Sequence, residues 1–270
     1  MTAMRQETIG KTKVFLSDPQ VLFREGIHFI LSGEDDFEVI GETTSNEEAY
    51  NAMIANPPRV AVLGMQDAKI SGPDITRRLK RNIPSLAVIL SMSVKETGQL
   101  FAAIKSGASA CITKDTDPDF LLNIIRVVAQ GSSPIMEEML SPELAALAIE
   151  EFKDITALNE QVDHLLALPT TVESQLLATI AAGNNLEQIE ARLSMTEDTV
   201  RHHLRYITSK LVSNEQSRTL VEAGQRSVTP IFRTAAMPSP NKESYVTKAE
   251  FNEFKEQFTE RLKSLLGELR

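Results

Sequence analysis

The sequence predicts a doubly wound α/β domain followed by an all-helical domain. Up to residue 130, short apolar runs alternate with amphipathic stretches, which is the pattern of βα units around a parallel sheet. From residue 141 onward the apolar residues recur with the period of a helix. At 270 residues the chain is long enough for two domains that each bury a hydrophobic core.

Five apolar runs account for the expected strands, because each is short, β-rich and bounded by polar residues. In chain order they read "KVFLS", "FEVIGE", "RVAVLG", "LAVILS" and "ASACIT", at residues 13–17, 37–42, 59–64, 86–91 and 108–113. Amphipathic stretches follow them and predict helices at 20–32, 45–56, 72–82, 94–106 and 117–130. Ser45 and Glu48 have the spacing of a capping box at the start of the second helix.

The carboxyl ends of the five strands should meet at one edge of the sheet, where sites in such folds are built. The residues expected there are Asp18, Gly64, Ser91 and Lys114. Gly64 ends a buried strand with no side chain, so the centre of this edge offers only backbone.

Residues 134–167 form an acidic linker helix, with eight acidic side chains and one basic. Its apolar residues fall on a heptad seam that Glu151 interrupts. Two interpretations stay open, a helix packed on its own domains and a coiled coil between two copies. The seam consists of Leu144, Ala148, Ile155, Leu158, Val162 and Leu165.

The remaining chain divides into a helical block at 168–226, a linker at 227–246 rich in Pro, Ser and Thr, and an amphipathic helix at 247–270. The last helix has an apolar stripe that must be buried by self-association, by docking on the first domain or by another protein. This stripe consists of Phe251, Phe254, Phe258, Leu262 and Leu265.

Composition excludes several classes of protein. With 42% apolar and 24% charged residues, and no apolar run near the roughly 20 residues of a membrane span, the chain is expected to be a cytoplasmic globular protein without membrane contact. Cys111 has no partner for a disulfide, and the four histidines lack zinc-binding spacing. No set of nucleophile, base and orienting residue is evident, so neither an enzyme nor a cofactor or metal is predicted.

The first domain is similar to the receiver domain of the NarL/FixJ class of two-component response regulators. The resemblance rests on "VFLSDPQVLFREGI", on "SGASACITKD" and on the five βα units, over residues 12–133. It implies a phosphoacceptor aspartate after the third strand, two acidic Mg²⁺ ligands after the first, and a Ser/Thr and a Lys that contact the phosphoryl group. Ser91 and Lys114 match the last two roles and Asp18 matches one acid.

Three positions depart from the receiver pattern. Pro19 replaces the second acid, Gly64 replaces the phosphoacceptor, and Cys111 replaces the aromatic residue of the fifth strand. Because phosphoryl transfer needs both a metal held by oxygen ligands and an oxygen nucleophile, we expect a receiver that aspartyl phosphorylation cannot switch. We expect Lys114 to pair with Asp18.

Three further interpretations of the degenerate receiver site stay open. Asp67 is a possible substitute acceptor of the phosphoryl group. A small ligand could fill the vacated pocket, or the residues could be a relic framework that stabilises the fold.

The helical block resembles a LuxR-type helix-turn-helix over residues 169–211. A helix ending at Gly183, a second opening near Asn185, the turn "LSMT" and a third helix capped by Thr196 have the arrangement of this motif. The resemblance implies a recognition helix at 197–211. Its DNA-contacting residues would be Arg201, His202 and Arg205 in the major groove, Lys210 and Thr196 on phosphates, and His203 on a phosphate or in packing.

Two departures qualify the helix-turn-helix assignment. Glu190 stands at a usually small position, and the family's glycine after the recognition helix is absent between Leu211 and Val212. The block is also nearly neutral, with six basic and seven acidic residues, so two copies should be needed for strong binding to double-stranded DNA.

The sequence thus favours a homodimeric, sequence-specific transcriptional regulator that acts without phosphorylation. The alternatives are a protein-interaction adaptor that keeps both folds, and a regulator gated by a ligand in the receiver pocket.

Overall fold

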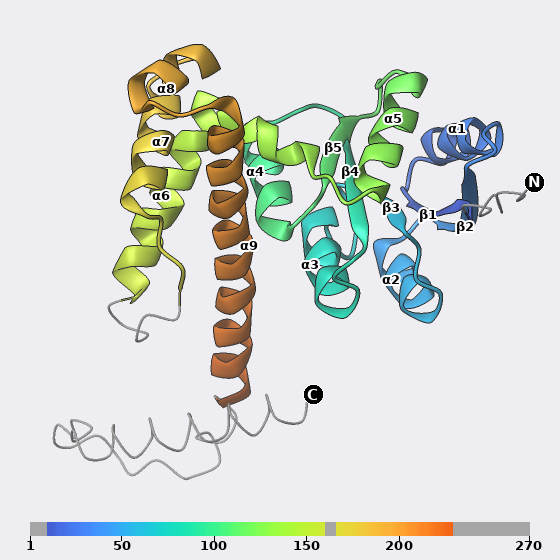
Figure 1. Cartoon of the computed structure of the whole chain (residues 1–270). Coiled ribbons are helices and arrows are strands. Elements are labelled where there is room, and N and C mark those ends of the chain that lie inside the picture. Colours follow the sequence, from blue (N-terminus) through green and yellow to red (C-terminus); the bar gives the residue numbers. More distant parts are fainter. Residues whose placement is uncertain (1–9, 160–165, 229–270) are drawn as a thin grey trace, which may run out of the picture. The chain divides into compact units, whose positions relative to one another are not determined.

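The computed structural model describes residues 10–159 and 166–228, and the described residues up to 223 belong to the first compact unit of the chain (Figure 1). Its centre is a parallel five-stranded sheet with strand order β2-β1-β3-β4-β5. The order turns back between β1 and β3, as doubly wound folds require, and this confirms the predicted fold class. The strands are β1 Thr12–Ser17, β2 Phe37–Thr43, β3 Val60–Gly64, β4 Ala87–Met92 and β5 Ala110–Thr113.

Each strand is followed by a helix, as the alternating pattern predicts. Ser45 caps the second helix by accepting a hydrogen bond from the N–H of Glu47. The predicted capping box is not completed, because the carboxylate of Glu48 accepts from the hydroxyl of Thr43 instead, at 2.7 Å. The helices are α1 Val21–Ser32, α2 Asn46–Ala55, α3 Gly72–Asn82, α4 Thr97–Ser106 and α5 Pro118–Ala129.

Two hydrophobic layers cover the faces of the sheet. Along β1, Val14 and Leu16 pack with α1 and α5 on one face, while Phe15 faces the opposite layer with α2, α3 and α4. The alternation follows from the strand period of two residues. The second layer is continuous with apolar residues of the later helices, among them Ile155 and Ile207.

The acidic linker forms a short 3-10 helix, η1 Pro134–Leu140, and the helix α6 Pro142–Asn159. Leu144, Ala148 and Ile155 of the predicted seam are buried in the core of their own chain. A side chain buried in this way cannot also face a second copy, so these positions favour a packed linker over a coiled coil. The other predicted association residues have no described side chains, namely Leu158, Val162, Leu165, Phe251, Phe254, Phe258, Leu262 and Leu265.

Three further helices form the helix-turn-helix block, α7 Thr171–Ala181, α8 Leu186–Leu193 and α9 Glu197–Val228. Capping boxes open α7 and α8, where Thr170 pairs with Glu173 and Asn185 pairs with Gln188. These reciprocal hydrogen bonds satisfy backbone N–H groups at the helix starts and fix where each helix begins.

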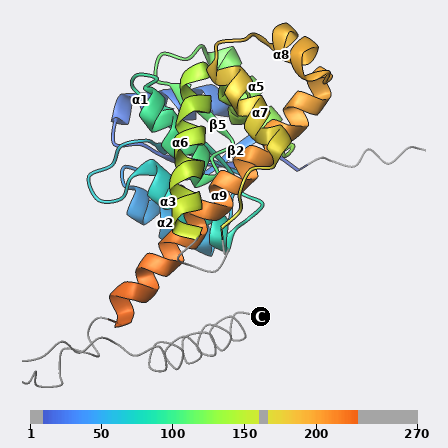
Figure 2. The ribbon, with the colours of Figure 1, turned by 90° about the vertical axis from the view of Figure 1, so that its left-hand side faces the viewer.

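The expected end of the recognition helix near residue 211 was wrong. α9 continues without a break to Val228. The family's glycine would supply a left-handed residue that ends a helix, and Leu211 and Val212 supply none. The recognition segment is therefore the first part of one long helix, which passes beside α6 and α3 (Figure 2).

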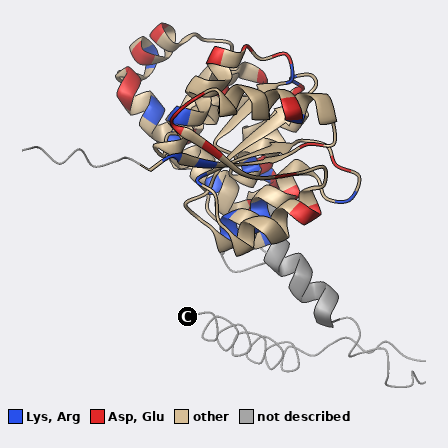
Figure 3. Ribbon diagram, turned by 90° about the vertical axis from the view of Figure 1, so that its right-hand side faces the viewer, with Lys and Arg blue, Asp and Glu red and all other residues tan. Residues whose placement is uncertain are grey.

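No helix among the described residues is both long enough and apolar enough to cross a bilayer. In the view of Figure 3, acidic and basic residues are interspersed over the described part of the ribbon.

Candidate functional site

The carboxylate of Asp18 is the centre of the site at the strand ends. Its Oδ1 accepts a hydrogen bond from Lys114 Nζ at 2.7 Å and from the backbone N–H of Gln20 at 2.8 Å. Its Oδ2 accepts from Ser91 Oγ at 2.9 Å. The residue is almost completely buried, with 3% of its surface exposed. The ion pair expected between Asp18 and Lys114 is present.

The sheet brings these residues together from four strands. Asp18 follows β1 and Lys114 follows β5, while Ser91 in β4 lies next to Gly64 of β3 in the register. Lys114 Nζ also lies 5.1 Å from the centre of the Phe23 ring of α1. The positive charge is therefore held between a carboxylate and an aromatic face.

Asp18 and Pro19 fill the space in front of Gly64. A Cβ added at Gly64 would lie 3.1 Å from Asp18 Oδ2 and 3.3 Å from Cδ of Pro19. Gly72, at the start of α3, also packs closely on this strand end, since a Cβ there would lie 2.7 Å from the carbonyl oxygen of Gly64. The structure therefore gives no support to a ligand bound in a vacated pocket beside Gly64.

The residues present do not fit the Mg²⁺ ion that the receiver resemblance implies. Mg²⁺ needs oxygen ligands in octahedral geometry, and neither Pro19 nor Gly64 carries one in its side chain. Both oxygens of Asp18 are already hydrogen-bonded to Ser91 and Lys114. Over residues 10–159 and 166–228, no group of three or more His, Cys, Asp or Glu is placed to hold a metal.

Asp67 has a structural role in the loop between β3 and α3. Its carboxylate accepts hydrogen bonds from the backbone N–H groups of Asn46 at 3.0 Å, Lys69 at 2.8 Å and Ile70 at 3.2 Å. Burial would raise the pKa of Asp67, but these hydrogen bonds outweigh it and hold the pKa below its ordinary value. A carboxylate that closes a loop in this way is poorly placed to accept a phosphoryl group.

Cys111 of β5 is an unreactive thiol in this structure. It is partly buried, and burial raises its pKa to about 12. The thiol is therefore not ionised near neutral pH, and a thiol in that state is a poor nucleophile.

The exposed face at the start of α9 carries the predicted base-reading residues. His202 and Arg205 are exposed, and Arg201 is half-buried. The guanidinium of Arg201 pairs with Glu197 on the same helix and with Glu137 of η1. Tyr206 lies on the same face, half exposed, with its ring centre 4.7 Å from that of His202 in an edge-on arrangement.

Sequence reasoning missed Tyr206 and Glu137. Tyr206 stands four residues after His202, a spacing that puts both side chains on one face of a helix, so this contact could have been found. Glu137 lies 64 residues before Arg201, and no local pattern signals a pair over that separation.

The other predicted DNA contacts have partners within the helical block. Lys210 Nζ donates to Glu173 at 2.5 Å, which differs from its expected role on a phosphate. Thr196 caps α9 by accepting from the N–H of Thr199, and His203 is half-buried beside His202. The spacing of α9 predicts that Thr199, Val200, Leu204 and Ile207 pack inward. Val200, Leu204 and Ile207 are buried, whereas Thr199 is only partly buried.

Replacing Glu173 by Gln is expected to lower the free energy of unfolding of the helical block by about 1–3 kcal/mol, since it removes a buried charged hydrogen bond. Burial would raise the pKa of Glu173, but hydrogen bonds from Lys210 and the Thr170 N–H hold it below its ordinary value of 4.5. Because the pKa is lower in the folded state, ionised Glu173 stabilises the protein at pH values above its ordinary pKa. This stabilisation is lost as the pH falls through the folded-state pKa.

Urea unfolding followed by circular dichroism between pH 3 and 7 measures both effects. We expect the variant to lose part of the acid-dependent stability of the wild type. Glu187→Gln, a change at an exposed position of α8, is the control and should leave the curve unchanged. Equal pH profiles for Glu173→Gln and the wild type would contradict the assignment.

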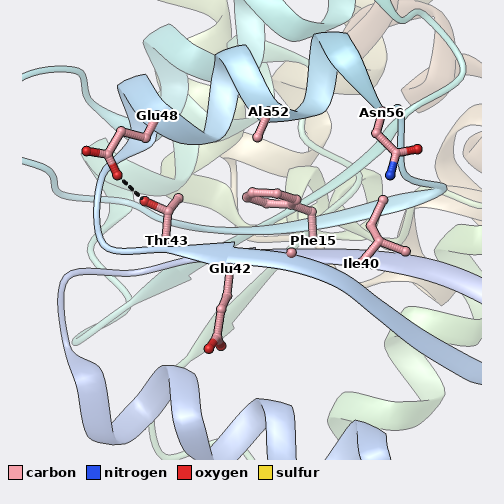
Figure 4. A pocket seen from close by; sticks show the side chains of 8 residues that line it. Phe15, Ile40, Glu42, Thr43, Glu48, Ala52 and Asn56 are labelled. Carbon is pink, nitrogen blue, oxygen red and sulfur yellow. Dashed lines mark hydrogen bonds between the residues drawn. The ribbon is translucent and has the colours of Figure 1, made fainter.

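A cavity of about 390 Å³ lies beside the edge strand β2, between β2 and α2 (Figure 4). The ring of Phe15 lies in it beside Ile40 and Ala52. Glu42 points away from it, and the carboxylate of Glu48 is bonded to Thr43. The polar groups do not converge on one point, so the cavity offers no arrangement for catalysis.

Comparison with known proteins gives matches over both parts of the chain. The family described as the response regulator receiver domain matches residues 14–126. The nitrate/nitrite response regulator protein homolog of Haemophilus influenzae is 31% identical over 202 residues, which cover 74% of this chain and 90% of that protein. The transcriptional regulatory protein DegU of Brevibacillus brevis is 27% identical, over 79% of this chain and 93% of that protein.

Among solved structures, the receiver domain of NarL from Mycobacterium tuberculosis matches 45% of this chain and 98% of its own, with 24% identity and a TM-score of 0.44.

Proposed function

Because this chain belongs to the response regulator family, we propose that it is a sequence-specific DNA-binding transcriptional regulator that works without aspartyl phosphorylation. The relatives it matches include transcriptional regulatory proteins, which supports the output. One observation carries the proposal that phosphorylation is not needed. The carboxylate of Asp18 accepts hydrogen bonds from both Ser91 and Lys114.

In the receiver resemblance, Ser91 and Lys114 are the residues that contact phosphoryl oxygens. Here an internal carboxylate gives them the same kind of partner, an anionic oxygen, at 2.9 Å and 2.7 Å. Gly64 supplies no nucleophile, and the space in front of it is filled. The serine and the lysine of the site are therefore already engaged in the absence of a phosphoryl group.

The exposed face of α9 supports DNA binding. Arg201 and Arg205 can each form the bidentate pair with guanine that reads sequence in the major groove, and His202 and Tyr206 lie beside them on the exposed surface of the helix. Since the domain is nearly neutral, two copies would be needed for strong binding, and the protein would act as a homodimer.

Incubation of the full-length protein with acetyl phosphate and Mg²⁺ is expected to add no phosphoryl group and to leave DNA affinity unchanged. The reason is that the site holds neither an acceptor nor the ligands of the metal. Intact-mass measurement checks the first result, and a DNA titration with and without the phosphodonor checks the second. A response regulator that keeps the acceptor aspartate serves as the positive control. A stable phosphoryl adduct, or tighter DNA binding after treatment, contradicts the proposal.

A second candidate function is that of a protein-interaction adaptor that does not bind DNA. The observation that favours it is the engagement of Arg201 by Glu137 and Glu197, which removes one base-reading group from the exposed surface. Selection of DNA by the wild-type protein separates the two functions.

A further inference from the structure

A second cavity, of about 380 Å³, is lined mainly by cations from α3, α4 and α9. Its acidic lining residues are Asp74 and Glu215, and its apolar one is Ile70. The basic side chains that line the cavity outnumber the acidic ones three to one. They are Lys69, Arg77, Arg78, Arg81, Lys105 and Arg218.

The inner cations of this cavity are held in an ion-pair network. Glu215 of α9 pairs with Arg77 and with Lys105, at 3.1 Å in both cases. Glu151 of α6 pairs with Lys105 at 3.0 Å and with Arg218 at 2.8 Å. These carboxylates join α9 and α6 to the receiver helices, so the cavity lies where the two domains of the first unit meet.

Two arginines at the cavity have no such partner. Over the part of the chain that the structure describes, no carboxylate lies within ion-pair distance of Arg78 or Arg81, and both side chains are exposed. They stand in the same helix as Arg77, which the network holds in place. The cavity therefore keeps a surplus of positive charge after its acids are counted.

We propose that this cavity binds a small molecule that carries two or more phosphate groups. The planar guanidinium group matches phosphate oxygens with paired hydrogen bonds, and an arginine cluster is the arrangement that such ligands need. The volume lies in the range of small-molecule sites, but the lining is almost entirely polar, which selects a charged ligand over an apolar one.

The same site connects a ligand to α9. Phosphate oxygens in the cavity would compete with the carboxylate of Glu215 for Arg77 and Lys105. Because Glu215 lies in the helix that begins with the recognition segment, the ligand would change how that helix is held (Figure 2). This coupling to DNA rests on the proposed function, whereas ligand binding itself does not.

Titration calorimetry of the full-length protein with inorganic tripolyphosphate tests the site without DNA. We expect saturable binding of one molecule per chain and at least a tenfold loss of affinity in the double variant Arg78→Gln and Arg81→Gln. The matched control, Lys11→Gln with Lys13→Gln, removes two exposed positive charges at the start of β1 and should change affinity less than twofold. Absence of saturable binding, or an equal loss in both double variants, overturns the proposal.

The variant Glu215→Gln adds a readout that a merely structural role would not move. By removing the competing carboxylate it should tighten tripolyphosphate binding severalfold, and weaker binding would contradict the assigned geometry. If DNA of any sequence displaces tripolyphosphate, and the Arg78 and Arg81 variant weakens DNA binding uniformly, the cavity is part of a DNA surface and the proposal is wrong. If tripolyphosphate binds but leaves the DNA affinity unchanged, the proposed binding site is supported and the proposed effect of the ligand on DNA binding is overturned.

Discussion

Replacing Arg201 and Arg205 together by Ala is expected to abolish selection of a DNA motif by the full-length protein. A bidentate pair between arginine and guanine discriminates by about 1–3 kcal/mol, so two such pairs per copy amount to roughly 2–6 kcal/mol, an affinity loss of about 30-fold to 10⁴-fold. Arg205 should account for more of the loss. It is exposed, whereas Arg201 must first leave Glu137 and Glu197 to reach a base.

Selection of genomic fragments by the purified protein, without a phosphodonor, measures this loss. A palindromic motif enriched by the wild type and lost by the variant is the expected result. The control, Lys11→Ala with Lys13→Ala, removes the same charge far from α9 in sequence and should keep the motif. If the wild type enriches no motif at low salt, the adaptor function is favoured. If the variant keeps the motif, the assignment of these two arginines to base reading is wrong.

The strand-end site could be predicted from the sequence because its geometry follows from local periods. The five apolar runs fix five parallel strands, and parallel strands place their carboxyl ends together. Asp18, Ser91 and Lys114 therefore had to meet beside Gly64, and they do. The predicted inward face of α9 is buried for a similar reason, since helical spacing alone determines which residues share a face.

The relations between distant segments could not be predicted in this way. Two ion pairs form only because elements far apart in the chain pack together, and no spacing rule predicts such pairs. They are Glu137 with Arg201 and Glu215 with Arg77. The cationic cavity was missed for the same reason, because its lining comes from three helices and the loop before α3. The length of α9 was predicted wrongly, although the sequence contained the relevant signal. The absence of the family's glycine weakened the family match, and the same absence allows the helix to continue past residue 211.

Replacing Asp18 by Ala is expected to lower the free energy of unfolding of the receiver-like domain by about 3–5 kcal/mol. Removing one partner of a buried ion pair leaves the other charge uncompensated, and that penalty exceeds the net stabilisation by the intact pair. Here the loss would leave Lys114 Nζ, Ser91 Oγ and the N–H of Gln20 without their acceptor. An exposed acid of the same domain, Asp35, provides the matched control, and Asp35→Ala should have a small effect.

A second change separates the ion pair from packing. In the double variant Asp18→Ala and Lys114→Met, the buried charge is removed with its partner, and most of the lost stability should return. Urea unfolding of the single and double variants gives the coupling energy of the pair. Equal destabilisation in Asp18→Ala and in the double variant would show that Asp18 acts by filling space in front of Gly64. Recovery would instead mean that the carboxylate stabilises the domain by compensating the charge of Lys114, so that the stability of the domain and the paired state of the site have the same origin.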